Sequence, residues 1–560
     1  MQAISAAIGK AGIQLFAQHI VAAHVIELLK TLPAPDRSIP VGGGWDIPCN
    51  KPQTKYAVRE GSFAITLNGG VAQNLDAKCT AVEQDPKDNT MFQCTFAAGP
   101  FSVKYNWTEN YVRNTYSYLQ GMGWVMTRSE SISNRYDYLP GFNGLTLKVK
   151  FQFKYDAGAG WEMVVQGKPE ISTTENNANI PAGSAVLYSG NQCNFGKSAS
   201  DATVQALQNI DFNGKVGDVV KGVIASIPTS GELGDGIRYD FSSGDDGLKF
   251  PAANSIQMGV KGGASYNGTA FSGATPPTLP LPVPPAENDI HHLDMYVSNY
   301  EVDALNWAFF KAGRLDTVVN AADLPDPDVL KVKTYVSILP ALKPFASFAM
   351  QAQISLNSAP TTSFQLVYEL TTEVLNTLKL KVSQQVYQLL TGLQGNNYVS
   401  KAALETDLNG AGIDSSNFST IETAAQSMGM VVGHDIHFTL IIQNFQSEQP
   451  QIVFNVKRTD ILGNLALGVG PNKTQTMQFG FKNAIWTAGF VSSTIPNFDG
   501  SSLAMVWGTA GEPRYDNLLA ALGATGVPIP IMQGFTFDFT NAELNMEEGY
   551  VSIKACVAYL

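Results

Sequence analysis

Histidine and cysteine are the residues of this chain best suited to catalysis or metal binding, and both are scarce. The 560 residues include six histidines and five cysteines. His434 and His437 are three positions apart in a strand-like run, where side chains at this spacing point to opposite faces, so we expect no metal site. The chain also lacks a nucleophile elbow, a zinc-protease motif, a phosphate-binding loop and a dinucleotide fingerprint. We therefore expect no catalytic residues, and a protein that is not an enzyme.

Two other kinds of residue could be modified. Cys79 and Cys94 lie on neighbouring strand-like runs, which makes them candidates for a hairpin disulfide. Four sequons are candidate glycosylation sites and favour a secreted protein. Their asparagines are Asn106, Asn267, Asn417 and Asn472.

The charge pattern excludes nucleic acid as a partner. Charged residues make up 15% of the chain, below the usual quarter, and the formal net charge is −12. Residues 1–288 carry 22 Lys and Arg against 24 Asp and Glu, whereas residues 289–560 carry 14 against 24. Neither part has the basic excess that binding to phosphates requires.

The first half of the chain is expected to begin with a helix and continue with long strands. The apolar periodicity from Ala3 to about Leu32 predicts one long helix with a broad apolar face. Strict alternation over 143–155, followed by a Gly-rich turn and a returning run, predicts a long hairpin in a strongly bent sheet. A second helical stretch covers about 216–227.

A proline-rich segment separates this first half from a second half with a similar order of helices and strands. Residues 275–285 contain six prolines, which predicts an extended, semi-rigid spacer. A strand at 293–298 and a helix at 301–311 follow it. A helical excursion over 380–430 and strands up to the C-terminus complete the second half. Each half thus combines a helix, many strands and another helix.

Four places in this plan resemble the family of bactericidal/permeability-increasing protein, lipopolysaccharide-binding protein and the phospholipid and cholesteryl ester transfer proteins, within the tubular lipid-binding superfamily. The matches follow the family's order along nearly the whole chain. They are Ile8 to Ile13 with Glu27 to Asp36, Ile237 to Asp240 with Val260 to Gly262, Met295 to Tyr300 with Ala304 to Gly313, and Gly526 to Pro530 with the final strands. The disulfide found in many members has no counterpart, because residues 200–230 contain no cysteine.

The resemblance implies an α+β fold. It implies a boomerang-shaped pair of highly twisted antiparallel β-barrels, each wrapping a long helix, joined by a central β-sheet and the proline-rich linker. The domains would be an N-terminal lipid-binding barrel over 1–273, a linker over 274–288 and a C-terminal lipid-binding barrel over 289–560. The first helix lies close to where the family's mature chains begin, so we expect a secreted protein whose signal peptide is absent from this chain.

The resemblance also implies one lipid pocket in each half, and the walls need only be apolar. For the first pocket we expect the helix residues Ile13, Phe16, Ala17 and Ile20 to face Val219, Val220 and Val223. For the second pocket we expect Ala304, Trp307, Ala308 and Phe310 to face Leu519 and Leu522. Each of these residues could equally be an ordinary core residue.

The expected function is therefore binding, and transport or transfer, of lipids in apolar tunnels without covalent chemistry. The ligand would be a phospholipid, a neutral lipid or another apolar small molecule, with transient contact to a membrane or lipoprotein surface and no other cofactor. Two alternatives remain open. One is a lipopolysaccharide-binding, antibacterial protein, which the near-neutral first half disfavours. The other is a surface-active or structural protein that uses the fold without a stored ligand.

Overall fold

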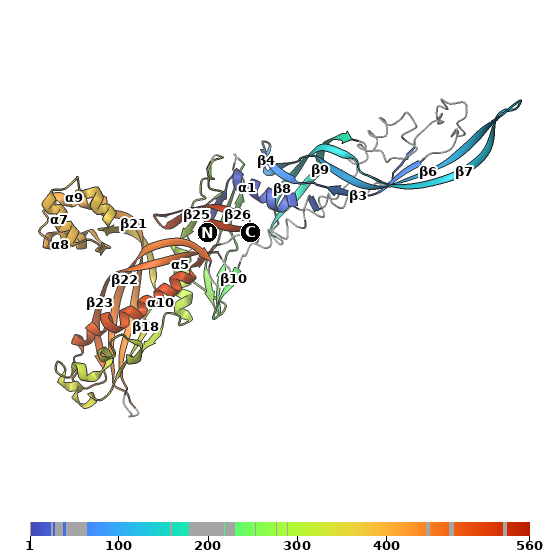
Figure 1. The fold of residues 1–560 in the computed structure, drawn as a ribbon. Helices are drawn as coiled ribbons and strands as arrows, with labels where there is room; N and C mark the ends of the chain where they lie inside the picture. Colours follow the sequence, from blue (N-terminus) through green and yellow to red (C-terminus); the bar gives the residue numbers. More distant parts are fainter. Residues whose placement is uncertain are drawn as a thin grey trace. The chain divides into compact units, whose positions relative to one another are not determined.

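The computed structural model describes residues 2–23, 26–27, 37–40, 64–156, 160–177, 218, 230–251, 254–275, 277–287, 289–443, 448–469, 475–529 and 535–559 (Figure 1). The chain forms two compact units. The larger unit comprises Met1–Ile8, Ile227–Lys249 and Ile256–Leu560, and the smaller unit comprises Gly9–Ser226 and Phe250–Ser255. Within the described residues the fold is mostly β, with several curled sheets and a few helices, in line with the predicted α+β class. The paired-barrel arrangement and the domain boundaries stay predictions.

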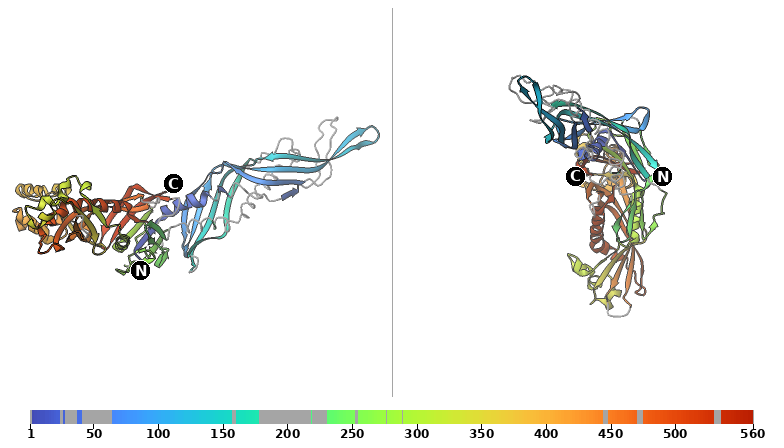
Figure 2. Two further views of the ribbon diagram at one scale, coloured as in Figure 1. Left: turned by 90° about the horizontal axis from the view of Figure 1, so that it is seen from below. Right: turned by 90° about the vertical axis from the view of Figure 1, so that its right-hand side faces the viewer.

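The smaller unit is built on one eight-stranded sheet with the order β2-β3-β6-β8-β5-β4, to which β7 adds beside β6 and β9 beside β8. Figure 2 shows its longer strands as twisted blue-to-cyan ribbons. The predicted alternation on β8 is confirmed, because Leu145, Leu147, Val149 and Phe151 are buried while Lys148 is exposed. The strands are β2 (Arg37–Pro40), β3 (Ala64–Gln73), β4 (Ala77–Asp85), β5 (Asp88–Ala98), β6 (Phe101–Leu119), β7 (Gly123–Tyr138), β8 (Gly141–Asp156) and β9 (Gly160–Asn177).

The predicted start of the first helix is wrong. Residues Ile4–Ile8 form strand β1, and helix α1 (Lys10–Phe16) with the π-helical turn η1 (Ala17–Ala22) begins only after Gly9. Strand β1 pairs with β13 on one side and β16 on the other, and four of its five residues are fully buried. A strand buried on both faces has a continuous apolar run, which periodicity alone does not distinguish from a buried helix.

A six-stranded sheet of the larger unit combines strands from both ends of the chain, in the order β12-β13-β1-β16-β26-β25. The predicted strand at 293–298 is therefore confirmed as β16. A four-stranded sheet, β10-β11-β14-β15, belongs to the same unit. The strands are β10 (Ser230–Gly234), β11 (Ile237–Asp240), β12 (Ser243–Lys249), β13 (Ile256–Val260), β14 (Ala264–Tyr266), β15 (Thr269–Ala270), β16 (Leu293–Ser298), β25 (Phe535–Glu547) and β26 (Tyr550–Tyr559).

The proline-rich segment is bound along its length to the larger unit. Gln2 donates its Nε2 hydrogen to the carbonyl of Leu279 at 2.7 Å, and Ser5 donates its hydroxyl to the carbonyl of Pro280 at 2.7 Å. Gln257 donates to the carbonyl of Pro282 at 2.6 Å. Because proline lacks an N–H group but keeps its carbonyl, side-chain donors can hold such an extended segment. Side-chain donors therefore hold the segment that is predicted to be an extended, semi-rigid spacer.

The second large sheet has the order β17-β18-β21-β22-β23-β24, with β19 beside β21 and β20 beside β19. Helix α10 (Glu512–Thr525) packs on β23, and helix α5 (Asn299–Lys311) packs on β19 and β14, which confirms both predicted helices. The strands are β17 (Thr317–Val319), β18 (Met350–Leu356), β19 (Thr361–Glu369), β20 (Asn397–Tyr398), β21 (Gln426–Ile442), β22 (Gln451–Val469), β23 (Gln475–Ser493) and β24 (Val527–Pro528). Short helical turns are η3 (Ala321–Asp323), η4 (Pro327–Leu330), η5 (Val332–Tyr335), η6 (Pro340–Phe345), η9 (Ser501–Met505) and η10 (Trp507–Gly511).

The predicted helical excursion is confirmed as a small bundle with a core of its own. Thr371, Ser383 and Ser400 each cap a helix by accepting a hydrogen bond from the backbone N–H three residues later. Leucines such as Leu378 and Leu408 are completely buried between the helices. The helices are α6 (Thr372–Leu378), α7 (Gln384–Gly392), α8 (Lys401–Gly410), η7 (Ser415–Asn417) and α9 (Phe418–Ala425).

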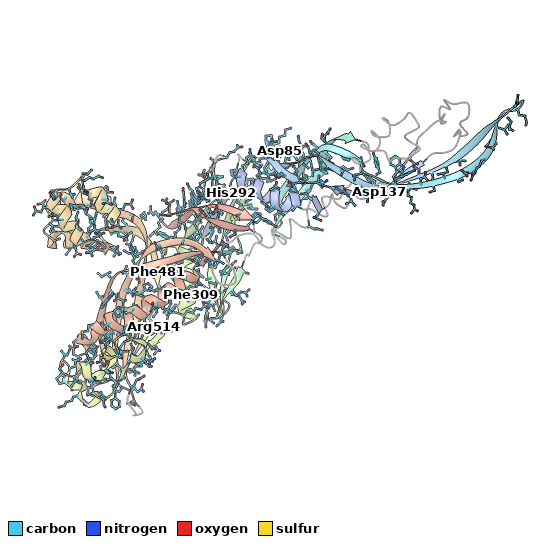
Figure 3. All side chains as sticks on the ribbon, in the orientation of Figure 1. Asp85, Asp137, His292, Phe309, Phe481 and Arg514 are labelled. Atoms are coloured by element: carbon cyan, nitrogen blue, oxygen red, sulfur yellow. The ribbon has the colours of Figure 1, made fainter. Side chains whose placement is uncertain are left out.

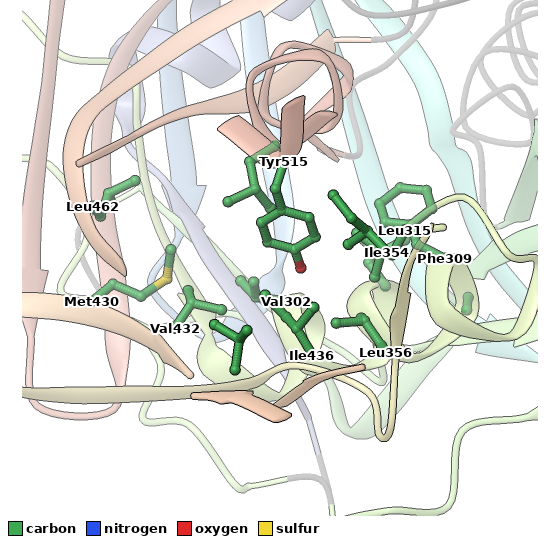
Figure 4. Close-up of a cluster of buried hydrophobic side chains, with 14 of the residues drawn as sticks. Val302, Phe309, Leu315, Ile354, Leu356, Met430, Val432, Ile436, Leu462 and Tyr515 are labelled. Atoms are coloured by element: carbon green, nitrogen blue, oxygen red, sulfur yellow. The ribbon is translucent and has the colours of Figure 1, made fainter. Parts of the chain in front are cut away.

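Aromatic side chains fill the space between α10, η10 and the second large sheet. Trp507 is completely buried and packs edge-on against Phe438, with ring centroids 5.4 Å apart, and against Tyr515 at 6.1 Å. Figure 4 shows Tyr515 among aliphatic side chains such as Val302 and Ile354. This region is a packed core, and room for a ligand must be sought at its margins.

Candidate functional site

Two hollows lie against helix α10, and the first is an inner cavity almost filled by its own walls. It is lined by Val302, Leu305 and Phe309 of α5 and by Leu519 and Leu522 of α10, together with the neighbouring strands. The room left for water-sized molecules is only about 30 Å³. One water needs about 10–15 Å³ measured this way, so the inner cavity cannot hold an alkyl chain unless its walls move.

The second hollow, an outer cleft between α10 and strands β22 and β23, is much larger. It offers about 580 Å³ to water-sized molecules, within the range of small-molecule sites. Its room comes from small residues, because Ala466, Gly480, Ala520 and Ala524 line it. Its polar lining residues are Arg458, Asn464, Gln478, Asp516 and Asn517.

The inner cavity and the outer cleft share one wall. Phe479, Phe481 and Leu519 line both hollows. Figure 3 labels Phe481 on β23 and Phe309 on α5, which lie on the two sides of this region. Phe479 and Phe481 are only partly buried. Together with Leu519 they form the wall between the two hollows.

Gly523 sets how closely α10 approaches the sheet. A Cβ atom at this position would lie 2.2 Å from the carbonyl oxygen of Phe479, a separation that no real contact allows. Three residues later, Gly526 ends the helix with φ at +70°, and its N–H bonds to the carbonyl of Leu522 at 3.1 Å. Both glycines line the inner cavity, so they keep its helical wall against β23.

A polar cluster lies beside both hollows, and strand register explains its composition. His434 on β21 is the direct cross-strand partner of Arg458 on β22. Asp460 is two residues after Arg458 and therefore faces the same side of the sheet. Helix α10 adds Tyr515 and Asp516. We call these five residues the polar cluster; Arg458 lines the outer cleft and His434 lines the inner cavity.

The polar cluster is tightly paired. Arg458 donates from Nε and Nη2 to the two oxygens of Asp460, at 2.8 and 2.7 Å, and also from Nη2 to Asp516. His434 places Nε2 3.3 Å from Asp460, and its Nδ1 lies 2.9 Å from the Tyr515 hydroxyl. The Arg458 guanidinium lies over the Tyr515 ring, 5.4 Å from its centroid. Arg458 and Asp460 are at least 98% buried, whereas the Asp516 side chain is 49% exposed.

The electrostatics keep the central pair ionised. Burial would raise the pKa of Asp460, but its contacts with His434 and Arg458 hold it below the ordinary value. Burial would lower the pKa of Arg458, but its contacts with Asp460 and Asp516 raise it instead. Burial raises the pKa of the Tyr515 hydroxyl, so this group stays protonated and can donate to His434.

Two buried nitrogens of the cluster make no hydrogen bond within the described residues, and one of them is Nε2 of His434, which lies 3.3 Å from Asp460. The other is Nη1 of Arg458. Buried guanidinium donors are normally satisfied, because an unpaired one loses its hydration without compensation. The outer cleft therefore combines apolar walls with a buried cationic group that still has hydrogen-bonding capacity.

The residues predicted for the second pocket fall on different sides of α5. Leu519 and Leu522 do line the inner cavity. Ala304 and Ala308 are fully buried elsewhere, and Trp307 packs on Phe271 with ring centroids 5.9 Å apart. Phe310 is partly buried against the core. Because α5 has buried residues on more than one side, including the polar Glu301, periodicity does not show which side faces the cavity; Val302, Leu305, Asn306 and Phe309 do.

The residues predicted for the first pocket are only partly described. Ile13, Ala17 and Ile20 are buried and Phe16 is half-buried, whereas Val219, Val220 and Val223 lie outside the described residues. α1 and η1 pack on β4, where Gln14 donates to the carbonyl of Cys79 at 3.2 Å and Gln18 accepts from its N–H. These contacts show how the helix is held, and the lipid contacts stay a prediction.

The candidate modification sites are mostly on the surface. Asn106 and Asn267 are exposed, Asn417 is half-buried, and Asn472 lies outside the described residues. Cys79 and Cys94 are buried free thiols that contact each other, so their disulfide stays a prediction. Contact with Cys94 lowers the pKa of Cys79, and contact with Cys79 together with burial raises the pKa of Cys94.

The described residues contain no cluster of three or more metal-binding side chains. As predicted, His434 and His437 face opposite sides of β21, the first buried and the second half-exposed. No helix in the described part of the chain is long and apolar enough to cross a membrane. The sequence did not predict Arg458 and Asp460 as site residues. A signal was present, because they alternate along the strand in step with the buried Ile452, Phe454 and Val456 and therefore face the same side.

Comparisons with known proteins give structural similarity alone. No protein-family model and no curated protein matches the chain. A crystal structure of lipopolysaccharide binding protein is 13% identical, with a TM-score of 0.49, over 100% of this chain and 99% of that one. Takeout 1 of Epiphyas postvittana is 11% identical, with a TM-score of 0.20, over 38% of this chain and 95% of that one. P47 of Clostridium botulinum E1 is 8% identical, with a TM-score of 0.23, over 99% of this chain and 98% of that one. All three TM-scores are below 0.5, so the functional argument rests on the cleft itself.

Proposed function

We propose that the protein binds a lipid or another apolar small molecule in the outer cleft and carries it without covalent chemistry. The observation that supports this proposal is the cleft of about 580 Å³ between α10 and β22–β23, lined by phenylalanine, leucine, alanine and glycine together with five polar residues. Sites for small molecules generally have this size. Burying one methylene group contributes about 0.8 kcal/mol, so even a partly inserted chain would bind.

The inner cavity extends the proposed site. Because it shares Phe479, Phe481 and Leu519 with the outer cleft, a rotamer change in this wall would give a chain access to the apolar residues of α5. The proposal therefore includes a ligand whose polar end stays in the cleft and whose tail extends towards α5. A phospholipid or a neutral lipid has this form.

A carrier role completes the proposal. In this role the protein transports or transfers the lipid outside the cell. It takes up the lipid through transient contact with a membrane or lipoprotein surface. A second site in the smaller unit, lined by the predicted residues of α1 and η1, also belongs to the proposal.

Blocking the cleft tests the proposal. Ala520→Phe places a ring in the cleft, whereas Ala521→Phe places the same ring on an exposed position of α10 that lines neither hollow. We expect Ala520→Phe to weaken binding of the fluorescent probe diphenylhexatriene at the cleft at least tenfold and Ala521→Phe to leave it unchanged. Mass spectrometry should show more copurifying lipid per protein molecule in the wild type than in Ala520→Phe, which keeps only the proposed site of the smaller unit. Equal binding by both variants, with no copurifying lipid, would overturn the proposal.

A further inference from the structure

We infer that Arg458 gives the outer cleft a preference for uncharged lipids that carry a carbonyl or hydroxyl oxygen, such as a fatty-acid ester or a fatty alcohol. This inference rests on the proposed function and specifies the chemical class of its ligand. The sequence motifs and the comparisons do not point to it; the geometry of the polar cluster does.

The first step is the unused donor. Nε and Nη2 of Arg458 are occupied by Asp460 and Asp516, and Nη1 has no acceptor in the described residues. Arg458 is itself a lining residue of the outer cleft and is 2% exposed. Nη1 itself is closed to water, so a ligand oxygen at the floor of the cleft supplies the missing acceptor once the side chains that cover Nη1 move aside.

The second step is the charge balance. The single guanidinium of Arg458 already contacts two carboxylates, those of Asp460 and Asp516. A carboxylate or phosphate on the ligand would bring a third negative group to one positive group, and this guanidinium is itself only 2% exposed. An ester carbonyl or a hydroxyl accepts the same hydrogen bond without added charge.

The third step is the setting of the donor. The apolar lining residues Phe479, Phe481, Leu519, Ala520 and Ala524 favour a hydrocarbon chain. The side chains of Asn464 and Asn517 are exposed, so water satisfies their hydrogen bonds when no ligand is bound. Buried Nη1 is the polar atom whose hydrogen bonding gains most from a ligand, because bulk water already satisfies the exposed groups.

A ligand series of one chain length tests this inference. Hexadecane, hexadecanol, methyl hexadecanoate and hexadecanoate, delivered from cyclodextrin, compete with diphenylhexatriene for the wild type. We expect the alcohol and the ester to bind about tenfold or more tighter than the alkane, and tighter than the anion. Tightest binding by hexadecanoate would overturn the inference in favour of an anion site in which the ligand displaces Asp516.

Two variants locate the preference. Arg458→Lys keeps the charge that Asp460 needs but lacks the Nη1 donor, and we expect it to bind ester and alkane within threefold of each other. Arg514→Lys makes the same exchange at an exposed position of α10 outside both hollows, labelled in Figure 3, and should keep the wild-type preference. A folded Arg458→Lys protein with the full wild-type preference would overturn the inference.

A spectroscopic readout does not depend on whether Arg458→Lys folds. The carbonyl band of ¹³C-labelled methyl hexadecanoate bound to the wild type should lie at lower frequency than in hexane, because a charged donor polarises the carbonyl. A band at the hexane frequency in the bound state would overturn the inference. Equal binding of alkane and ester would overturn the role of Arg458 while leaving apolar binding intact, whereas failure of all four ligands to displace the probe would overturn the proposed function itself.

Discussion

The inner cavity and the outer cleft are neighbours with a common wall, yet they differ about twentyfold in the room they offer, about 30 against about 580 Å³. Bulky side chains such as Phe309 and Leu522 fill the cavity, whereas Ala466, Gly480 and Ala520 leave the cleft open. The polar cluster serves both, with His434 on the cavity side and Arg458 on the cleft side. The difference shows that room for a ligand depends here on the few small residues at the helix–sheet margin.

Asp460→Asn should have the largest effect, because it leaves buried Arg458 without its main partner. Removing one partner of a buried ion pair typically costs about 3–5 kcal/mol of unfolding free energy. Asp516→Asn is the matched control, since its half-exposed carboxylate contributes about 1 kcal/mol or less. Urea denaturation of the two variants measures the difference; equal midpoints would show that the floor of the cleft does not depend on the buried pair.

Leu519→Ala should break the wall between the two hollows. Leu519 is 6% exposed, and truncation of a buried leucine costs about 2–5 kcal/mol. The enlarged space should also bind diphenylhexatriene more tightly. Leu518→Ala, at a partly buried neighbour that lines neither hollow, should cost less and leave probe binding unchanged. Weaker probe binding by Leu519→Ala than by Leu518→Ala would contradict the common wall.

Helix α5 should make the stability of the larger unit depend on pH through Glu301, which lines neither hollow. Complete burial raises the pKa of Glu301, on the cavity helix α5, from 4.5 to about 8. Between these pH values the folded state keeps a proton that the unfolded state has released, so stability falls as pH rises from about 4.5 to about 8 and levels off above that pH. We expect the larger unit to lose about 2 kcal/mol between pH 6 and pH 8 through this group.

Glu301→Gln should flatten this pH dependence, because glutamine does not titrate. The cleft side should not contribute over the same range, since the pKa of Asp460 is already below its ordinary value. Asp294 and Asp303, whose pKa values burial raises to about 6, add to the slope near pH 6 in both proteins. Thermal unfolding from pH 6 to pH 9 measures the effect, and parallel curves for the two proteins would refute it.

Tyr515→Phe should have the smallest effect, and it tests the cavity end of the polar cluster. It removes the hydroxyl that lies 2.9 Å from Nδ1 of His434 and leaves that nitrogen without its partner, at a cost of about 1–2 kcal/mol. Probe binding in the outer cleft should not change, because Tyr515 does not line it. A loss of probe binding would show that the two hollows do not act separately.

The sequence predicted the elements of the larger unit better than their orientation. The strand at 293–298, the helix at 301–311 and the helical excursion were predicted from their apolar patterns, and side chains cap the helices of the excursion at Thr371, Ser383 and Ser400. The first strand was predicted as helix, because a short apolar run buried on both faces has no period of its own. The pairing of this strand with both β13 and β16 depends on residues more than 200 positions away, which no local pattern reveals.

Only part of the candidate site was predicted, because neither the facing side of α5 nor the buried charged pair of β22 is marked by a sequence motif. Leu519 and Leu522 line the inner cavity, as expected, but α5 has buried residues on more than one side and its facing residues could not be chosen from periodicity. Arg458 and Asp460 were not predicted as site residues, because they belong to no sequence motif. Both lie at buried positions of an alternating strand, which is the pattern that marks a charged pair inside a core.

The most direct test of the account is a crystal structure with a methyl ester brominated at the end of its chain. The anomalous signal of bromine locates the tail and the electron density locates the ester. We predict the carbonyl oxygen within about 3 Å of Nη1 of Arg458 and the bromine along the wall formed by Phe479, Phe481 and Leu519. Bromine bound only outside the outer cleft, with Nη1 still without an acceptor, would contradict the account.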